Sequence, residues 1–405
     1  MHRLKTLMAF MLVISLVLGM GLTVSAANDT VKITLDGKAL VTDQAPRFED
    51  NFTLVPVRSI VEALGGVVNY NNTTKRVVIT TADHKIELEL NNRYALVDKK
   101  TITMDVPMRG FSGRTFVPAR FIAESLGADV TYESSSKTVV IKYFSKMSGS
   151  LKLSGSTTIQ PVADAAALKV MDMNKGKLTV TVTGGGSGVG KKDAAAGTVN
   201  IGNCSAALTS SDKATYPELV ETQIGSDAIA VIMNKANPVK NLTKQQVFDI
   251  FTGKITNWKD VGGNDAPILV QVRESTSGTA SSFFDLAIKG IDANAKIPAG
   301  FTPSISSGSL AQAVISNANA IGYDSFGYID PKTVKAVSIE SIECTANNVN
   351  AMIWPYTRSL VMLTKGAPSQ LSAMFINYIR STEGQKIMVE KDYIELRNEY
   401  AKSVQ

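Results

Sequence analysis

From residue 150 onward, short apolar strands alternate with helices, and this alternation constrains the fold more than any other feature. Apolar runs at Leu151–Leu153, Leu178–Val182 and Val199–Gly202 predict strands, and Pro161–Met173 and Lys191–Ala196 predict the helices between them. This order predicts an α/β fold with a mostly parallel sheet and helices on both of its faces. Ligands of such sheets bind beyond the carboxyl ends of the strands.

The loops at those strand ends are rich in glycine and hydroxyl groups. A third loop follows a predicted strand at Pro267–Val272 and leads into a helix predicted at Ala280–Ile288. The three loops read Gly155-Ser-Thr157-Thr158, Gly184-Gly-Gly-Ser187-Gly-Val-Gly190 and Arg273-Glu-Ser-Thr-Ser277-Gly278-Thr279. Each loop therefore places possible hydrogen-bond donors at the start of a helix.

These loops together indicate an anion site. A helix N-terminus presents unpaired N–H groups and a partial positive charge. Glycine lets the backbone approach a ligand closely, and hydroxyl groups add hydrogen-bond donors. Arg273 adds a guanidinium cation that can form bidentate hydrogen bonds. One such loop is ordinarily only a helix cap. Three of them, one with an arginine, predict an oxyanion-binding cleft.

The second loop also comes close to the phosphate loop of nucleotide hydrolases. In Gly185-Gly-Ser-Gly-Val-Gly190-Lys191-Lys192, however, Lys192 stands where that loop needs the Ser or Thr that binds magnesium. Nucleotide hydrolysis is therefore not expected.

The three loops, over residues of about 150–396, resemble the phosphate-binding proteins of phosphate ABC transporters. Further shared motifs are Phe251-Thr-Gly-Lys-Ile-Thr-Asn-Trp258, Ala320-Ile-Gly-Tyr323 and Tyr356-Thr-Arg358. The resemblance implies a two-lobed Venus-flytrap of the periplasmic-binding-protein fold, type II-like, over 151–396. Lobe one would comprise 151–228 and 352–396, and lobe two 229–351, with a hinge near 225–230 and 350–355. An ABC permease would then recognise the form of the protein that has closed over the anion.

The resemblance also implies roles for single residues. The phosphate contacts carried over by position are Thr157, Thr158, Ser187, Arg273, Ser277, Gly278 and Thr279. Trp258 and Arg358 are expected to be structural. Ser205 falls where the family commonly has an aspartate that accepts the proton of hydrogen phosphate, and it joins the site as a residue that can either donate or accept. We therefore expect weaker discrimination of phosphate from sulfate.

The first third of the chain contains an internal repeat with an offset of 62 residues. Leu54-Val-Pro-Val-Arg58-Ser-Ile-Val-Glu62-Ala-Leu-Gly65 recurs as Phe116-Val-Pro-Ala-Arg120-Phe-Ile-Ala-Glu124-Ser-Leu-Gly127. Each unit predicts a helix that ends at its glycine, followed by a hairpin. Ile33–Leu35 and Lys85–Leu90 predict further strands. The pairs Arg58 with Glu62 and Arg120 with Glu124 are expected to be structural ion pairs.

This doubled unit, at 31–143, resembles the copper amine oxidase N-terminal-like domain of exported proteins. His84 is its one histidine, so copper chemistry is not expected, and His84 is expected to lie on a surface strand. The resemblance therefore implies a spacer or a module that contacts the cell wall, and the cell wall is a possible partner. Residues 144–150, rich in Ser, Gly and Lys, are expected to form the linker to the flytrap.

The first 26 residues have the pattern of a secretory signal peptide, with a basic start, an apolar run at Leu7–Leu22 and small residues at Val24-Ser25-Ala26. No cysteine lies near the expected cleavage site, so a lipid anchor is not expected. The predicted location is outside the cytoplasm, at the cell surface or wall. Loss of Arg3 and Lys5 with this leader lowers the net charge from +6 to +4, which does not favour a nucleic-acid partner.

The whole chain contains two histidines and two cysteines, which excludes a three-histidine metal site and a zinc knuckle. No cofactor, metal or catalytic residue is therefore expected, and the protein is expected not to be an enzyme. Cys204 and Cys344 could form a disulfide or remain two buried thiols. Two alternatives to phosphate capture stay open: binding of another oxyanion, such as sulfate or molybdate, and a structural or sensing role at the cell surface.

Overall fold

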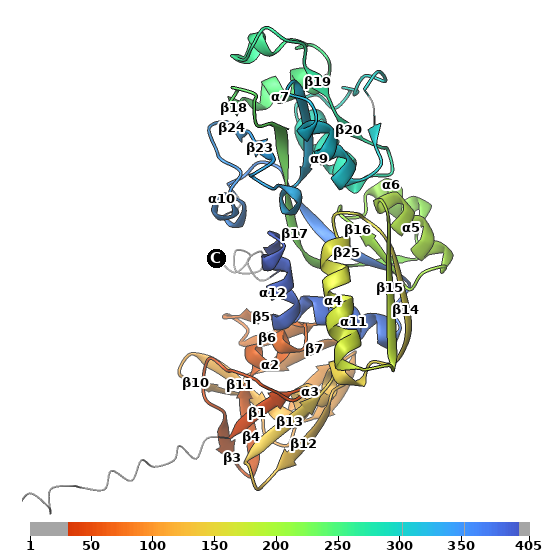
Figure 1. Ribbon diagram of the computed structural model, residues 1–405. Helices are drawn as coiled ribbons and strands as arrows, with labels where there is room; N and C mark the ends of the chain where they lie inside the picture. The colour runs from red at the N-terminus through yellow and green to blue at the C-terminus, as the bar shows by residue number, and fades with distance from the viewer. Residues whose placement is uncertain (1–30, 302, 352, 397–405) are drawn as a thin grey trace, which may run out of the picture.

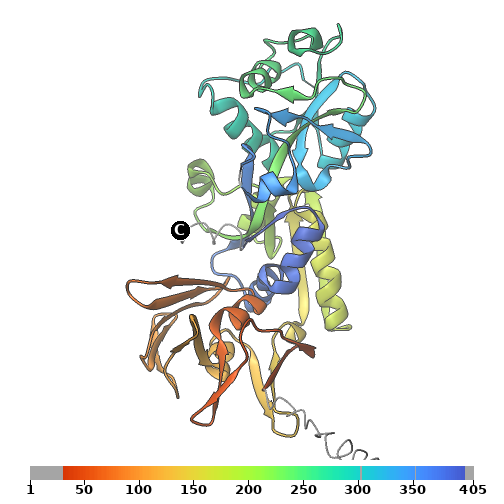
Figure 2. The same ribbon diagram turned by 90° about the vertical axis from the view of Figure 1, so that its left-hand side faces the viewer.

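The protein has three parts that lie end to end, as both views of the ribbon show (Figures 1 and 2). The computed structural model describes residues 31–301, 303–351 and 353–396, so the expected signal peptide lies outside the described residues. A strand-rich module occupies one end, one lobe of the flytrap lies in the middle, and the second lobe lies at the far end. Within the described residues, no helix combines the length and apolar character that crossing a bilayer requires.

The module is built from the two predicted repeats. Its elements are β1 Lys32–Leu35, β2 Lys38–Ala39, β3 Arg47–Glu49, β4 Phe52–Pro56, α2 Val57–Ala63, β5 Val67–Asn71, β6 Arg76–Thr80, β7 Lys85–Glu89, β8 Tyr94–Val97, β9 Lys100–Thr103, β10 Arg109–Phe111, β11 Arg114–Pro118, α3 Ala119–Ser125, β12 Asp129–Glu133 and β13 Thr138–Lys142. The predicted helices and hairpins are confirmed: α2 and α3 follow a proline, and β5–β6 and β12–β13 pair antiparallel. Gly65 and Gly127 have φ of +84° and +83°, which favours glycine at both helix ends.

The flytrap continues from the module through η1 Phe144–Lys146. Its first lobe contains β14 Gly149–Gly155, α4 Gln160–Met173, β15 Leu178–Gly185, α5 Ser187–Ala196, β16 Ile201–Cys204, α6 Ser210–Thr215, β25 Thr357–Lys365, α11 Gln370–Arg380, α12 Thr382–Glu390 and β26 Ile394–Glu395. The second lobe contains β18 Asn241–Leu242, α7 Lys244–Phe251, η2 Trp258–Val261, β19 Leu269–Val270, β20 Val272–Arg273, α8 Gly278–Phe283, η3 Phe284–Lys289, β21 Pro303–Ser304, α9 Ser307–Ile315, β22 Ala320–Ser325, η4 Phe326–Tyr328, β23 Val334–Ala336, β24 Ser338–Ile339 and α10 Ala346–Asn350. Strand β17, Leu219–Asn234, belongs to both lobes.

The large sheet is mixed and not mostly parallel as predicted. Its order is β15-β14-β16-β25-β17-β22-β19, and the β15-β14-β16 part is parallel. Strands β25 and β17 are antiparallel to their neighbours because the chain crosses between the lobes along them. β17 pairs with β25 in lobe one through Ala228 and with β22 in lobe two from Ile229 onward. The crossing on β17 falls within the expected hinge segment 225–230, whereas β25 begins at Thr357, just beyond the expected segment 350–355.

Residues 144–150, which are expected to form the linker, pack against both the module and lobe one. Phe144 and Met147 are buried. The Asp36 carboxylate accepts hydrogen bonds from the backbone N–H groups of Tyr143, Phe144 and Ser145 at 2.9, 3.0 and 3.1 Å. This segment is held by both parts of the chain, because the Phe144 carbonyl also accepts a hydrogen bond of 2.9 Å from Asn174, the residue that follows α4.

The module and lobe one share one hydrophobic core, which runs from β1 to α12. Asn377 of α11 joins the two parts. Its Oδ1 accepts from the Ala82 N–H at 2.9 Å, and its Nδ2 donates to the Tyr143 hydroxyl at 3.0 Å and to Asp83 Oδ1 at 3.1 Å. Lobe two has a separate core. The module is thus fixed to lobe one, and among the described residues it has no core in common with lobe two.

Candidate functional site

The three predicted loops meet where the two lobes face each other. α4 and α5 of lobe one and α8 of lobe two begin at these loops. α5 starts at Ser187, four residues before the predicted helix, because Gly186 with φ of +86° provides the turn that precedes it. Ser277 caps α8 and accepts a hydrogen bond from the Ala280 N–H at 3.2 Å.

Thr158 and Thr279 connect the loops across the lobes. Their Oγ1 atoms lie 3.2 Å apart, and both side chains are buried. The backbone also bridges the lobes, since the Gly188 N–H donates to the Thr276 carbonyl at 2.8 Å. The lobes are therefore closed on each other around these loops.

Thr157 contributes to this closure through its backbone. Its carbonyl accepts a hydrogen bond of 2.6 Å from the hydroxyl of Tyr328 in lobe two. The Thr158 carbonyl accepts a similar bond of 2.7 Å from Tyr393. These two tyrosines fix the loop before α4, a function that the sequence did not indicate.

Ser187, Ser205 and Gly278 are packed together. The Ser205 N–H donates to Ser187 Oγ at 3.1 Å, and the two hydroxyl oxygens lie 3.3 Å apart. A Cβ on Gly278 would lie 2.2 Å from Ser187 Oγ and 2.7 Å from Ser205 Oγ. Such distances are too short for nonbonded atoms, so only glycine allows lobe two to approach lobe one here.

Arg273 is buried in lobe two with its guanidinium held on several sides. Its Nε donates to the Ser304 carbonyl at 3.2 Å, and its Nη1 donates to Ser307 Oγ at 3.0 Å. The Arg273 N–H donates to the Tyr323 hydroxyl at 3.1 Å. Burial lowers the pKa of Arg273, and the charge of Asp324 is the largest opposing influence.

Arg358 joins the site from lobe one, although it was expected to be structural. Its Nη1 donates to Ser205 Oγ and its Nη2 to Thr158 Oγ1, both at 3.3 Å. It also forms a buried ion pair with Asp227. The Tyr356-Thr-Arg358 motif is present in the sequence, but the contact of Arg358 with two predicted anion residues depends on pairing between β17 and β25.

Two buried carboxyl groups accompany the two arginines. Burial raises the pKa of Asp227, and Arg358 counteracts this effect. Burial raises the pKa of Asp324 to about 6, although hydrogen bonds from the Ser325 N–H and the Ser307 hydroxyl and the charges of Arg273 and Arg358 lower it. The sequence does not indicate Asp324, because a single aspartate in an apolar strand carries no signal of its neighbours.

The remaining predictions concern Lys191 and the two cysteines. Lys191, which follows the glycine-rich loop, forms a 2.6 Å ion pair with Asp212. Cys204 and Cys344 are free thiols in different lobes, and burial raises the pKa of both. Within the described part of the chain, no group of three or more His, Cys, Asp or Glu side chains is arranged to hold a metal ion.

The geometry thus provides two buried guanidinium groups, one from each lobe, together with buried hydroxyl groups and three helix N-termini. Each of these groups is a hydrogen-bond donor, and donors of this kind favour a small oxyanion over a neutral or cationic ligand.

Comparison with known proteins agrees with this chemistry. Residues 144–383 match the PBP superfamily domain, and residues 34–141 match the copper amine oxidase N-terminal domain. The phosphate-binding protein PstS of Bacillus subtilis is 35% identical over 253 residues, which are 62% of this chain and 81% of the relative. PstS of Borreliella burgdorferi is 28% identical over 254 residues, which are 61% and 90% of the two chains.

Solved structures give the same picture. A substrate-binding protein assigned to a phosphate ABC transporter of Clostridium perfringens, solved with bound phosphate, is 37% identical with a TM-score of 0.57. The match covers 61% of this chain and all of that one. An ABC-type phosphate transport receptor from Vibrio cholerae is 32% identical with a TM-score of 0.51, and the match covers 60% and 99% of the two chains.

Proposed function

Since this chain belongs to the PBP superfamily through residues 144–383, we propose that it captures inorganic phosphate between its lobes and delivers it to an ABC transporter. The relatives named as phosphate-binding proteins and the phosphate-bound structure support this function. The protein acts outside the cytoplasm, as transport receptors of this kind must. It binds and releases its ligand without chemical change.

The observation that carries the proposal is the convergence of Arg273 and Arg358 from opposite lobes. Two buried cations repel each other, and the charge of Arg358 lowers the pKa of Arg273. A doubly charged anion between them would replace this repulsion with two attractions. Because the site is buried, these attractions are stronger than they would be in water. Anion binding therefore stabilises the closed form that a permease recognises.

Hydroxyl and N–H groups of the three loops complete the site. Thr158, Ser187, Ser205, Ser277 and Thr279 are all buried, as expected for groups that a bound ligand contacts in a closed cleft. A phosphate affinity near 1 μM requires about 8 kcal/mol. Hydrogen bonds to charged groups contribute roughly 1.5–3 kcal/mol each, so an anion with several such partners reaches this value.

The proposal is tested by calorimetric titration of the full chain with phosphate, sulfate and molybdate. Phosphate is expected to bind most tightly. Arg273→Ala should abolish phosphate binding, whereas Lys191→Ala should retain it because Lys191 is paired with Asp212. Tighter binding of sulfate or molybdate would show that phosphate is not the preferred ligand. Unchanged phosphate binding by Arg273→Ala would show that the proposed site is wrong.

A further inference from the structure

The module is organised around a pseudo-twofold axis. Strands β4 and β11 pair antiparallel, and the equivalent residues Val55 and Val117 are directly opposite each other. The repeat offset of 62 residues also relates β1 to β8, β3 to β10 and α2 to α3. A surface feature of one repeat is therefore expected at the equivalent position of the other repeat, across this axis.

Two grooves follow this symmetry. The first is lined by Pro56, Arg58, Val68 and Tyr70 and has a volume of about 530 Å³. The second is lined by Pro118, Arg120, Val130 and Tyr132 and has a volume of about 250 Å³. These four positions differ by 62 residues in every case. The opposite wall is equivalent too, since Gly110 and Thr115 of the first groove correspond to Phe48 and Thr53 of the second.

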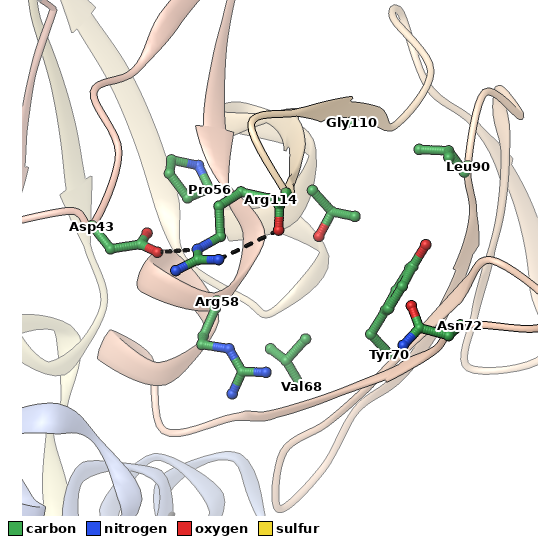
Figure 3. A pocket seen from close by; sticks show the side chains of 11 residues that line it. Asp43, Pro56, Arg58, Val68, Tyr70, Asn72, Leu90, Gly110 and Arg114 are labelled. Atoms are coloured by element: carbon green, nitrogen blue, oxygen red, sulfur yellow. Dashed lines mark hydrogen bonds and ion pairs between the residues drawn. The ribbon is translucent and has the colours of Figure 1, made fainter. Parts of the chain in front are cut away.

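Polar groups surround an aromatic ring in the first groove. Figure 3 shows Tyr70 and Asn72 on one side of the groove, with Arg58 and Arg114 across from them. Arg114 is held by Asp43, to which its Nε donates at 2.6 Å. Arg58 contacts Glu62 at 3.3 Å, but its side chain is 58% exposed. An exposed ion pair of this kind contributes little to stability, so the Arg58 guanidinium can turn to a ligand at small cost.

The second groove repeats the arrangement of arginine and tyrosine with more apolar surface. Arg120 is 60% exposed and contacts Glu124 at 3.6 Å. Tyr132 and Phe48 are 43% and 62% exposed. Among the described residues, the exposed aromatic side chains are Phe48, Tyr94 and Tyr132, and all three lie in the module. Phe48 and Tyr132 both line the second groove, so two of these exposed rings gather at one site.

We propose that the two grooves form a paired binding site for a carboxylate-bearing polysaccharide. The face of a tyrosine ring packs against the C–H face of a sugar ring, while a guanidinium binds a carboxylate with two parallel hydrogen bonds. The Asn72 and Asn51 amides, one in each groove, can bond sugar hydroxyl groups. Both grooves thus contain the donors and the apolar surface that one acidic sugar unit requires.

The duplication favours a polymer over a single small ligand. Two equivalent grooves on one rigid module can bind two units of a repeating chain, and the second contact then occurs at a high effective concentration. The fixed junction with lobe one also has a consequence: a polymer bound to the module holds lobe one in place, while lobe two, which shares no core with the module, stays free to open.

Affinity electrophoresis of the full chain in gels with polygalacturonate tests this proposal, with dextran as the neutral polymer. Polygalacturonate should retard the protein, and dextran should not. The double variant Arg58→Ala with Arg120→Ala should weaken retardation roughly tenfold or more, and each single variant should weaken it less. Tyr70→Ala with Tyr132→Ala should also weaken it. Unchanged phosphate titration would show that the variants remain folded.

Arg76→Ala provides the matched control. Arg76 lies in the same module, is 56% exposed and contacts Glu89 at 3.4 Å, which closely matches Arg58. Its substitution should leave retardation unchanged. The proposal is overturned if polygalacturonate does not retard the parent protein, if dextran retards it equally, or if Arg76→Ala weakens retardation as much as the double variant. Equal retardation by DNA with the same dependence on Arg58 and Arg120 would also overturn it, because the site would then be selective for charge alone.

Discussion

Arg358 and Asp227 face each other on neighbouring strands, and two guanidinium nitrogens of Arg358 donate to one oxygen of Asp227. Nε and Nη2 lie 3.0 and 2.6 Å from Oδ2. The side chains are 2% and 0% exposed. The pair orients the guanidinium so that its other donors reach Thr158 and Ser205. The ion pair therefore has a structural function and also positions a cation at the proposed anion site.

Asp227→Ala should destabilise the protein strongly, because it leaves the Arg358 charge buried without its partner. Breaking a buried pair in this way costs about 3–5 kcal/mol. The free energy of unfolding from urea titration measures the loss. Lys386→Ala, which removes the exposed pair with Glu383 in the same lobe, should cost less than about 1 kcal/mol. A small effect of Asp227→Ala would mean that Arg358 does not depend on this carboxylate.

Ser205→Asp should raise the selectivity for phosphate over sulfate. A carboxylate at this position would accept the proton of hydrogen phosphate and repel sulfate, which has no proton to donate. Because Arg358 Nη1 already donates to the Ser205 hydroxyl, the new carboxylate would also have a cationic neighbour. The dissociation constant for sulfate divided by that for phosphate, both measured by calorimetry, should rise roughly 10- to 100-fold.

Ser205→Asn separates charge from shape in that experiment. Its side chain has nearly the size of aspartate but no negative charge, so the selectivity should stay close to that of the parent. If the asparagine and aspartate variants discriminate equally, the argument that a negative charge at this position repels sulfate is incorrect.

Asp324 should make both stability and anion binding depend on pH. Its pKa is about 6 in the folded protein against 3.8 for the isolated group, so the folded state holds this proton more tightly. The bound proton therefore stabilises the folded state. This contribution to the free energy of unfolding is complete below about pH 4, is lost as the pH rises through 6, and amounts to about 3 kcal/mol. Asp324→Asn should therefore remove this loss and raise the free energy of unfolding at pH 7.

Protonation of Asp324 should also strengthen anion binding. Arg273, Arg358, Tyr323, Tyr328 and Ser307 surround this carboxyl, and its ionised form partly neutralises the two arginines. Sulfate is the appropriate probe, because its own charge does not change in this range. Its affinity should increase as the pH falls through about 6 in the parent and stay constant in Asp324→Asn. A pH dependence that the variant retains would exclude Asp324 as its source.

The parts of this site that sequence reasoning could predict are those with local signals. Thr158, Ser187 and Thr279 can be predicted because glycine, serine and threonine before a helix are a signal contained in a few neighbouring residues. The contact between Arg358 and Asp227 joins residues 131 positions apart, and the contact between Asn377 and Ala82 joins residues 295 apart. Such contacts depend on strand register and on packing between the parts. For the same reason, residues 144–150 resembled a linker although Phe144 and Met147 are buried.

The repeat provides a direct test of how the module is attached to lobe one. Gly65 and Gly127 occupy equivalent positions with nearly equal positive φ, so replacement by alanine imposes the same backbone strain at both. A Cβ on Gly65, however, would lie 2.0 Å from the carbonyl oxygen of Asn377, whereas a Cβ on Gly127 would meet Tyr143 at 3.8 Å and His84 at 3.9 Å. Gly65→Ala therefore adds a clash with α11 that Gly127→Ala does not.

Gly127→Ala should cost about 1 kcal/mol, as expected for alanine at positive φ, and should leave a single cooperative unfolding transition. Gly65→Ala should separate the module from lobe one, so that calorimetry shows two transitions and protease cleaves the chain between residues 143 and 150. Phosphate affinity should change little, because the proposed anion site lies between the lobes, on the side of lobe one away from the module. Equal behaviour of the two variants would show that the module does not depend on close contact with Asn377 for its attachment.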